Sequence, residues 1–234
     1  MKAIILCAGL GSRLKERTGS IPKPMIHYKG TPILEKNIEL CRQANITDIV
    51  INLHHCPEII LEYFGNGEKF GVQLTYSYED VLLGTAGAVK NNEIFFSGGD
   101  FLVIYGDNYS DYDLSDLTAR HEEKNADATI AVFPLKNPHQ SGIVSVDDDS
   151  MVTGFIEKPK NLADGYYLVN MGVYVISGAM INFIPLGFSD FGRDIFPNWC
   201  GDNKKIYAAQ MTSKVIAIDT PELFDENIKN FHKL

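Results

Sequence analysis

The chain has 234 residues, with 21 basic against 30 acidic side chains and a formal net charge of −9. Its 45% hydrophobic and 22% charged content is typical of a globular protein and excludes disordered, collagen-like and small disulfide-stapled chains. The acidic balance argues against a general nucleic-acid binder, because such proteins need a basic surface to displace phosphate counterions. An anionic ligand would therefore have to be held by local cations, backbone amides or a metal ion.

The sequence contains no membrane or secretion signal. No run approaches the roughly 18 apolar residues of a membrane span, and the N-terminal apolar run stops at Gly9, too early for a signal peptide. The four cysteines have no CxxC spacing, which favours reduced thiols that pack as small hydrophobic residues. We expect a cytoplasmic protein with no membrane or nucleic-acid partner.

In the first half, short apolar runs alternate with helical patterns. Residues 3–7 form an apolar run that ends in glycines, as expected of a buried parallel strand. Further strands are expected at 48–53, 72–78, 101–105 and 128–133, and helices after Pro32 and at 57–64, 84–89 and 114–121. This alternation predicts a parallel sheet with helices on both faces.

The second half contains more strands in succession. Strands are expected at 143–146, 152–156, 166–176, 206–210 and 214–218, and helices at 179–184, 191–200 and 221–231. No linker rich in proline or serine separates the halves. We therefore expect a single domain over residues 1–234.

A glycine loop directly follows the first strand. Gly9 and Gly11 allow backbone N–H groups to converge on an anion. A dinucleotide-binding loop would have a third glycine in place of Arg13, and an acid where the second strand ends in Asn52-Leu53-His54-His55. A Walker loop would need Gly-Lys-Ser/Thr. Neither of these two phosphate-binding motifs fits.

Lys23 lies ten residues beyond the loop, between Pro22 and Pro24. The two prolines restrict its backbone, and a cation held rigidly beside a glycine loop suits a triphosphate. The alternative is that this segment is an exposed surface turn and that Arg13 simply begins a helix.

These residues match a known family pattern. Ala8-Gly9-Leu10-Gly11-Ser12-Arg13-Leu14 followed by Pro22-Lys23-Pro24-Met25 resembles the signature of the sugar-1-phosphate nucleotidyltransferases. The resemblance continues, in order, through Leu83-Gly84-Thr85-Ala86-Gly87-Ala88, Tyr105-Gly106-Asp107-Asn108, Glu157-Lys158-Pro159, Asn170-Met171-Gly172, Asp190-Phe191-Gly192-Arg193-Asp194 and Thr220-Pro221-Glu222. Each motif is weak alone, but their order is specific, and the set most resembles the mannose- or heptose-1-phosphate guanylyltransferase branch.

The resemblance implies a Rossmann-like three-layer α/β/α sandwich with a mostly parallel mixed central sheet. It also implies transfer of a nucleoside monophosphate from an NTP, with GTP favoured, to a mannose- or heptose-type sugar 1-phosphate for polysaccharide synthesis. A sugar phosphate is mostly dianionic at neutral pH and needs no general base, so catalysis is positioning and charge neutralisation. The alternatives are a cytidylyl- or other nucleotidyltransferase, a non-catalytic nucleotide-sugar-binding subunit, or an oxidoreductase. The oligomeric state stays open, with a homodimer as one candidate.

The family pattern implies a nucleotide-binding half at about 1–110 and a sugar-phosphate-binding half at about 111–234. The amides of Gly9 and Gly11 with Arg13 would take the leaving phosphates, and Arg13 and Lys23 would be the catalytic cations. The full nucleotide-binding set is Leu6, Ala8, Gly9, Gly11, Ser12, Arg13, Lys23, Glu79, Gly84 and Thr85. Glu79, an acceptor-only carboxylate, could pair with the ring N–H and amino group of guanine or with the amino group of cytosine. The alternative for Glu79 is a solvated acid at a strand end, and the His54-His55 pair is expected to be satisfied or exposed rather than a ligand set.

The pattern assigns sugar-phosphate contacts to the second half. Lys158 would hold the sugar phosphate, Glu157 and Asn170 would bind sugar hydroxyls, and Gly142 would let the sugar approach closely.

A Mg²⁺ cofactor is also implied. Asp107 follows an apolar strand, where ligands gather in open α/β sheets, and its carboxylate suits Mg²⁺. Asp219 is the second candidate ligand. The family pattern reads Asp-Ile/Val-Gly-Thr-Pro, and alignment on Thr220 places Ala217 at the acid. Either a shorter loop lets Asp219 reach the metal, or the second ligand is lost.

Overall fold

The computed structural model describes residues 1–11, 14–212, 216, 218 and 220–228. The chain packs as two compact units. The first unit comprises Lys2–Leu82, Ile104–Asp111 and Val215–Leu234, and the second comprises Leu83–Val103 and Tyr112–Lys214 together with Met1. Residues 83–103, which the sequence places in the N-terminal half, therefore pack with the second unit.

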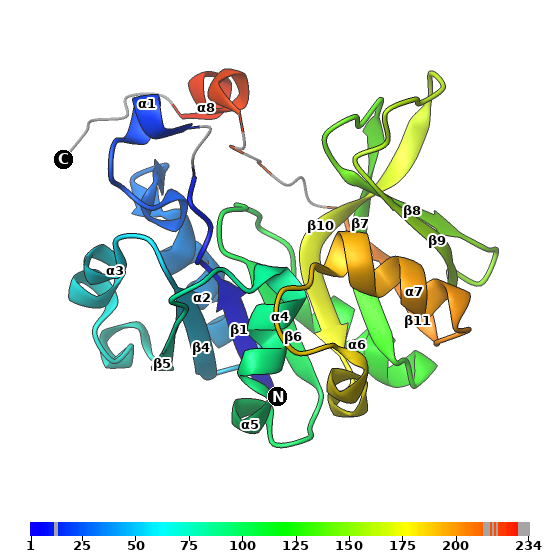
Figure 1. Ribbon diagram of the computed structural model, residues 1–234, viewed down its shortest axis with the longest axis horizontal. Coiled ribbons are helices and arrows are strands. Elements are labelled where there is room, and N and C mark those ends of the chain that lie inside the picture. Colours follow the sequence, from blue (N-terminus) through cyan, green and yellow to red (C-terminus); the bar gives the residue numbers. More distant parts are fainter. Residues whose placement is uncertain (12–13, 213–215, 217, 219, 229–234) are drawn as a thin grey trace. The chain divides into compact units, whose positions relative to one another are not determined.

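The first unit is built on parallel strands. β1 (Lys2–Leu6), β4 (Asp48–Leu53) and β5 (Gln73–Tyr78) lie side by side in the order β1–β4–β5 (Figure 1). Almost all of β4 is buried, as expected of a parallel strand covered on both faces. Because parallel strands end at the same edge, the residues that follow β1, β4 and β5 are brought together there.

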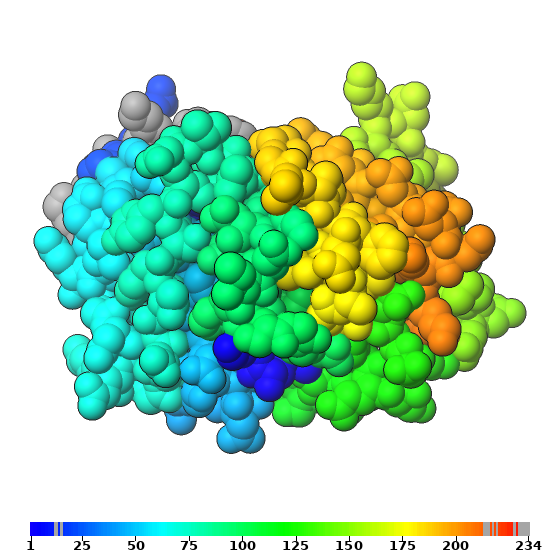
Figure 2. Space-filling view, turned by 60° about the horizontal axis from the view of Figure 1, so that its bottom comes forward, coloured from blue at the N-terminus to red at the C-terminus, as the bar shows by residue number. Residues whose placement is uncertain are grey.

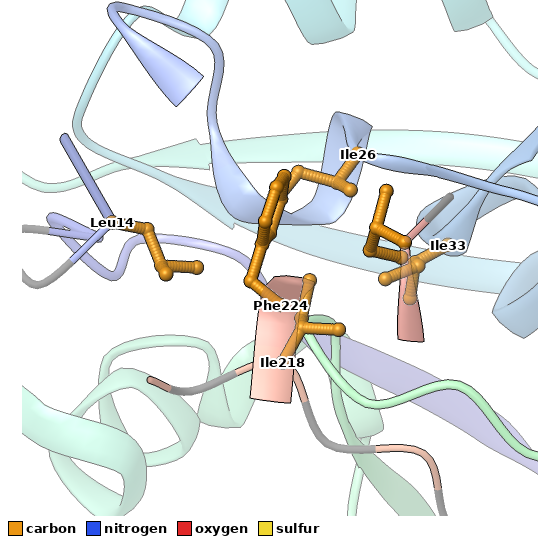
Figure 3. Close-up of a cluster of buried hydrophobic side chains, with 6 residues drawn as sticks. Leu14, Ile26, Ile33, Ile218 and Phe224 are labelled. Carbon is orange, nitrogen blue, oxygen red and sulfur yellow. The ribbon is translucent and has the colours of Figure 1, made fainter. Parts of the chain in front are cut away.

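The first unit also contains a cluster of buried apolar side chains. The helices of this unit are α1 (Lys15–Thr18), η2 (Lys23–Met25), α2 (Ile33–Gln43), α3 (Pro57–Phe64), η3 (Glu68–Phe70) and α8 (Pro221–Asn227), with a small hairpin of β2 (His27–Tyr28) and β3 (Thr31–Pro32). The cluster comprises Leu14, Ile26, Ile33, Ile218, Phe224 and Ile228 (Figure 3). It joins the segment after the glycine loop to the C-terminal segment, and α1 and α8 lie next to each other (Figure 1).

The second unit has a mixed sheet. Its strands are β7 (Ala128–Lys136), β8 (Gly142–Val146), β9 (Val152–Glu157), β10 (Tyr166–Ile176) and β11 (Ile206–Gln210). β7 pairs with β11 and β10, while β8 lies off this strand order and pairs with β10 and β9. Of these four pairs, β11–β7 is parallel and the others are antiparallel. Its helices are α4 (Gly84–Asn91), α5 (Glu93–Phe96), α6 (Leu114–Lys124), η4 (Gly178–Phe183), η5 (Phe191–Ile195) and α7 (Phe196–Gly201). The segment between β9 and β10 projects from the surface (yellow-green in Figure 2).

An aromatic core joins α7 to this sheet. Phe196 packs on Tyr174, Phe191, Phe155 and Trp199, with ring centroids 4.9–6.0 Å apart. β6 (Phe101–Tyr105) begins in the second unit and ends in the first. No helix among the described residues is long and apolar enough to cross a membrane.

Two predicted helices differ from expectation. The segment 191–200 starts as a π-helical turn because Asp190 accepts hydrogen bonds from the N–H groups of Gly192 and Arg193, and its carbonyl accepts one from Ile195. The segment 179–184 is a 3₁₀ helix, η4. The expected strand at 214–218 and the end of the expected helix at 221–231 fall mostly outside the described residues, and α8 ends at Asn227.

Candidate functional site

The glycine loop and Lys23 are in contact in the first unit. Gly11 has a φ of +59°, and a Cβ atom there would lie 3.3 Å from Cγ of Lys23. The N–H of Leu14 donates to the Gly11 carbonyl over 2.9 Å and closes the turn. The expected proximity of loop and cation is therefore present, while Ser12 and Arg13 lie outside the described residues.

Lys23 is buried, with only 7% of its surface exposed. It begins η2, whose turn is closed by the Met25 N–H donating to the Pro22 carbonyl and the Ile26 N–H donating to Lys23. Its Nζ lies 3.3 Å from Oδ2 of Asp107. The alternative of an exposed Pro-Lys-Pro surface turn is therefore wrong.

Asp107 is held beside the end of β1 by the preceding glycine. The N–H of Gly106 donates to the Leu6 carbonyl over 2.9 Å, and a Cβ at Gly106 would lie 2.5 Å from Sγ of Cys7. Only glycine permits this approach. The two predicted site residues from distant parts of the sequence, Lys23 and Asp107, therefore meet at one strand edge.

The carboxylate of Asp107 suits a magnesium ion. It is a hard oxygen donor, partly exposed, and Mg²⁺ commonly takes one or two carboxylates and completes its shell with phosphate oxygens and water. Within the described ranges, no group of three or more His, Cys, Asp or Glu side chains could hold a metal ion. Asp219 and Ala217 lie outside those ranges, so the second ligand stays a prediction.

Glu79, directly after β5, is buried with 6% of its surface exposed. Nδ2 of Asn52 donates to its Oε1 over 2.8 Å, and its own N–H donates to the Leu53 carbonyl over 2.9 Å. Nδ1 of His54 lies 2.7 Å from the Glu79 carbonyl, and because a carbonyl only accepts, this nitrogen carries the proton. The alternative of a solvated strand-end acid is wrong, and the expectation that His54 is satisfied is confirmed.

In the second unit, two glycines surround the Glu157 carboxylate. Cβ atoms at Gly142 and Gly192 would lie 2.8 Å and 2.7 Å from its Oε2. Burial raises the pKa of Glu157, although the cation of Lys158 opposes the shift. Nζ of Lys158 is 3.7 Å from Oε1 of Glu157, and the Lys158 side chain is 42% exposed. The close approach expected at Gly142 is thus made by Glu157, together with the ring of Phe155.

Asn170 is tied into β10. Its Oδ1 accepts from the N–H of Gly172 over 2.8 Å, and its Nδ2 donates to the hydroxyl of Tyr174 over 2.7 Å. Gly172 has a φ of +72°, and the pairing of β10 with β7 shifts between Asn170 and Tyr174. Asn170 thereby stabilises an irregularity in the strand, and its predicted role in sugar binding stays a prediction.

Gly84 and Thr85 lie in the second unit, whereas Gly9, Gly11, Lys23 and Glu79 lie in the first. Gly84 has a φ of +72°, and a Cβ there would clash with the carbonyl of Ser189. The hydroxyl of Thr85 donates to Oδ2 of Asp190 and accepts from the N–H of Phe191, both over 2.9 Å. The first residues of α4 therefore pack against and hydrogen-bond to residues 189–191.

Comparison with known proteins decides the family. A family model described as nucleotidyl transferase matches residues 2–215, almost the whole chain. The chain belongs to the nucleotidyl transferase family.

The curated relatives act on sugar phosphates according to their names. A UTP–glucose-1-phosphate uridylyltransferase of Synechocystis sp. is 36% identical over 90% of this chain and 58% of its own length. A probable mannose-1-phosphate guanylyltransferase of Oryza sativa is 32% identical over 87% of this chain and 57% of its own length. This nucleotidyl transferase chain thus spans about three fifths of the length of the curated relatives it matches.

Solved structures confirm the fold. HddC from Yersinia pseudotuberculosis in complex with GMP-PN has a TM-score of 0.81 and 26% identity, and 97% of each chain is covered. A putative glucose-1-phosphate thymidylyltransferase from Bacillus anthracis has a TM-score of 0.86 at 24% identity, over 100% of this chain and 98% of its own, which shows the fold alone. The Rossmann-like α/β/α expectation and the resemblance to sugar-phosphate nucleotidyltransferases are confirmed.

Sequence reasoning missed one polar residue in this nucleotidyl transferase, Asn52, which contacts Glu79. Asp190, which contacts Thr85, lies in one of the motifs that carry the family resemblance. The signal for Asn52 was a buried amide near the end of an otherwise apolar strand, where an unpartnered polar group would be costly.

Proposed function

We propose that this chain transfers a nucleoside monophosphate from an NTP to a sugar 1-phosphate and releases pyrophosphate, with GTP and a mannose- or heptose-type sugar favoured. The observation that carries the proposal is the convergence of the Gly11 turn, the buried Lys23 and the Asp107 carboxylate. A buried cation beside a glycine loop is suited to a polyphosphate, which an acidic protein needs such local charge to hold. We also propose a cytoplasmic location, because the four free cysteines suit a reducing compartment.

The proposed reaction needs charge neutralisation rather than proton transfer. A phosphate oxygen of the sugar 1-phosphate attacks the α-phosphorus, and the bond to the bridging oxygen breaks, so that the electron pair leaves with pyrophosphate. Lys23 offsets negative charge on the transferring and leaving groups, which in a water-poor site is worth several orders of magnitude in rate. Mg²⁺, held by Asp107, supplies further charge neutralisation when bound.

The second unit supplies the proposed sugar contacts. The exposed Lys158 ammonium is suited to the sugar phosphate, and the neighbouring Glu157 carboxylate offers acceptors for sugar hydroxyls. Burial raises the pKa of Glu157, so the neutral form, which can also donate one hydrogen bond, persists to a higher pH than in an exposed glutamate.

The choice of GTP has two supports. Several relatives are named mannose-1-phosphate guanylyltransferases, and the HddC structure holds GMP-PN. Glu79 also presents a buried carboxylate, an acceptor for the donor edge of guanine. The 36% identical relative uses UTP by name, so the nucleotide must be measured.

The test is a matrix of four NTPs against sugar 1-phosphates, with pyrophosphate release and product mass both measured. The proposal predicts a GDP-sugar as the main product. A CDP- or UDP-sugar as the main product would contradict the preference for GTP and support the transfer reaction. No release from any pair, with retained binding of a nucleotide sugar, would contradict transfer and support a non-catalytic binding subunit.

A further inference from the structure

One buried side chain connects the three parallel strands of the first unit at their carboxyl ends. Asn52, in β4, is 3% exposed. Its Oδ1 accepts from the N–H of Cys7, just after β1, over 2.7 Å. Its Nδ2 donates to Oε1 of Glu79, just after β5, over 2.8 Å.

The orientation of this amide is determined by its partners. A backbone N–H can only donate, so the oxygen of Asn52 must face Cys7 and the nitrogen must face Glu79. The reversed amide would place two donors together at Cys7 and two acceptors together at Glu79. Both contacts are buried, where an unsatisfied polar group is costly, so the orientation is strongly favoured.

Asn52 also restricts the carboxylate of Glu79. The backbone of Glu79 is held by Leu53 and His54, and Asn52 holds the end of its side chain. A carboxylate offers about four acceptor positions, of which Asn52 uses one. The donor at this place therefore restricts the Glu79 carboxylate to one orientation.

We propose that Asn52 is a positioning residue that sets the base preference of the enzyme, by holding Glu79 as the acceptor for a base edge that carries two adjacent donors. Guanine has such an edge, made of its ring N–H and its 2-amino group, whereas uracil has a ring N–H and no amino group. This inference rests on the proposed function, because it assumes that Glu79 faces the base of the bound NTP.

The test compares GTP with ITP, which lacks only the 2-amino group. The dissociation constant of each nucleotide is measured calorimetrically with Mg²⁺, for the full chain and its variants. Loss of a hydrogen bond to a charged acceptor costs about tenfold or more in affinity, so the wild type should prefer GTP by about that factor. In Asn52→Asp, which keeps the acceptor for Cys7 but places a second carboxylate against Glu79, the preference should fall to about twofold or less.

Three further variants make the test specific. Glu79→Gln should also abolish the preference, and the double variant should lose no more than either single one, because both act through one interaction. Asn37→Ala is the matched control: Asn37 is buried in the same unit, and its Nδ2 lies 3.4 Å from the Gly106 carbonyl. This control should change the two affinities equally and leave their ratio unchanged.

The outcomes separate this inference from the proposed reaction. A merely structural Asn52 would weaken GTP and ITP equally, and an unchanged ratio in folded Asn52→Asp would overturn the inference. A wild type that binds GTP and ITP equally would overturn it too. Pyrophosphate release with an unaffected ratio would uphold transfer and contradict the role of Asn52. A ratio of GTP to ITP affinity that depends on Asn52, without pyrophosphate release from any substrate pair, would uphold the role of Asn52 and contradict transfer.

Discussion

The carboxylates of Asp107, Glu79 and Glu157 are buried or half-buried, and they differ in how closely a cation or a hydrogen-bond donor approaches them. Asp107 lies 3.3 Å from the Lys23 ammonium, and Asn52 donates to Glu79 over 2.8 Å. The Lys158 cation is 3.7 Å from Glu157 and too exposed to offset its burial, so the pKa of Glu157 is raised. Asp107 and Glu79 thus each have a close partner, whereas the burial of Glu157 is not offset by its neighbour.

Replacing Lys23 should impair turnover much more than folding. In Lys23→Ala we expect kcat to fall by about 10²- to 10³-fold, the usual cost of losing one charge-stabilising donor. Pyrophosphate release at saturating substrates measures this. Lys36→Ala is the control, because Lys36 pairs with Glu39 at 2.9 Å and is not part of the candidate site, so its turnover should match the wild type. A Lys23→Ala rate within twofold of the wild type would contradict the role of Lys23.

The raised pKa of Glu157 makes its effect on stability depend on pH. Since the folded state favours the neutral form, the stability this group contributes is full below its ordinary pKa of 4.5 and is lost as pH rises through the higher folded value. Glu157→Gln, which cannot ionise, should therefore gain in Tm over the wild type as pH increases, by on the order of a few °C at pH 8.

Thermal unfolding at pH 4 and pH 8 checks this prediction. The difference in Tm between Glu157→Gln and wild type should be larger at pH 8. The exposed Glu123→Gln, in the same unit, should show little difference at either pH. A gain confined to pH 4 would show that the sign is wrong.

At the scale of elements, the close approach of the β6 end to β1 holds Asp107 in place. Gly106→Ala would put a Cβ 2.5 Å from Sγ of Cys7 and 2.9 Å from the Leu6 carbonyl. We expect a loss of about 1–3 kcal/mol in the free energy of unfolding, as for overpacked cores, measured by urea denaturation. Gly99→Ala, where the nearest atom would be 3.9 Å away, should change stability little. Equal stability of the two variants would contradict the tight contact.

Helix α8 is held by apolar packing rather than by its ion pair. Phe224 is buried in the cluster of Figure 3, whereas the adjacent Asp225 pairs with Arg17 on the surface at 2.9 Å. Phe224→Ala should destabilise α8 by about 3 kcal/mol or more, and Asp225→Asn by less than about 1 kcal/mol. Amide hydrogen exchange of α8 measures both. A larger loss in Asp225→Asn would reverse this ranking.

Helices and strands were predicted correctly where residues within the element itself determine its structure. Strands β4, β6 and β10 match their predicted bounds, because each is an apolar run. The predicted helix at 191–200 was wrong in its first turn, because the Asp190 cap, itself contacted by Thr85, favours a π-helical start. That contact joins residues 105 positions apart, which no local pattern reveals.

The same limit applies to the candidate site. The motifs singled out Gly11, Lys23 and Asp107, and the fold brings these three together. Asn52 was not predicted as a site residue, because its partners directly follow the neighbouring strands and reach it only through the strand register. Sequence motifs therefore identified residues on loops, while a supporting residue inside a strand required the structure.

At the scale of the whole molecule, the two units divide the proposed work. The first carries Gly11, Lys23, Glu79 and Asp107, proposed for the triphosphate, the base and the metal ion. The second carries Glu157 and Lys158, proposed for the sugar phosphate, together with Gly84 and Thr85 of the predicted nucleotide-binding set. The division does not follow the chain, since residues 104–111 belong to the first unit and bring Asp107 with them. Two polyanionic substrates in a chain of net charge −9 need this local concentration of cations and amides.

The most direct measurement is a crystal structure of the full chain with Mg²⁺ and a non-hydrolysable GTP analogue. The account predicts phosphate oxygens against the Gly11 turn and within hydrogen-bond distance of Lys23 Nζ, with Mg²⁺ on Asp107. A triphosphate bound away from the Gly11 turn and Lys23 would contradict it.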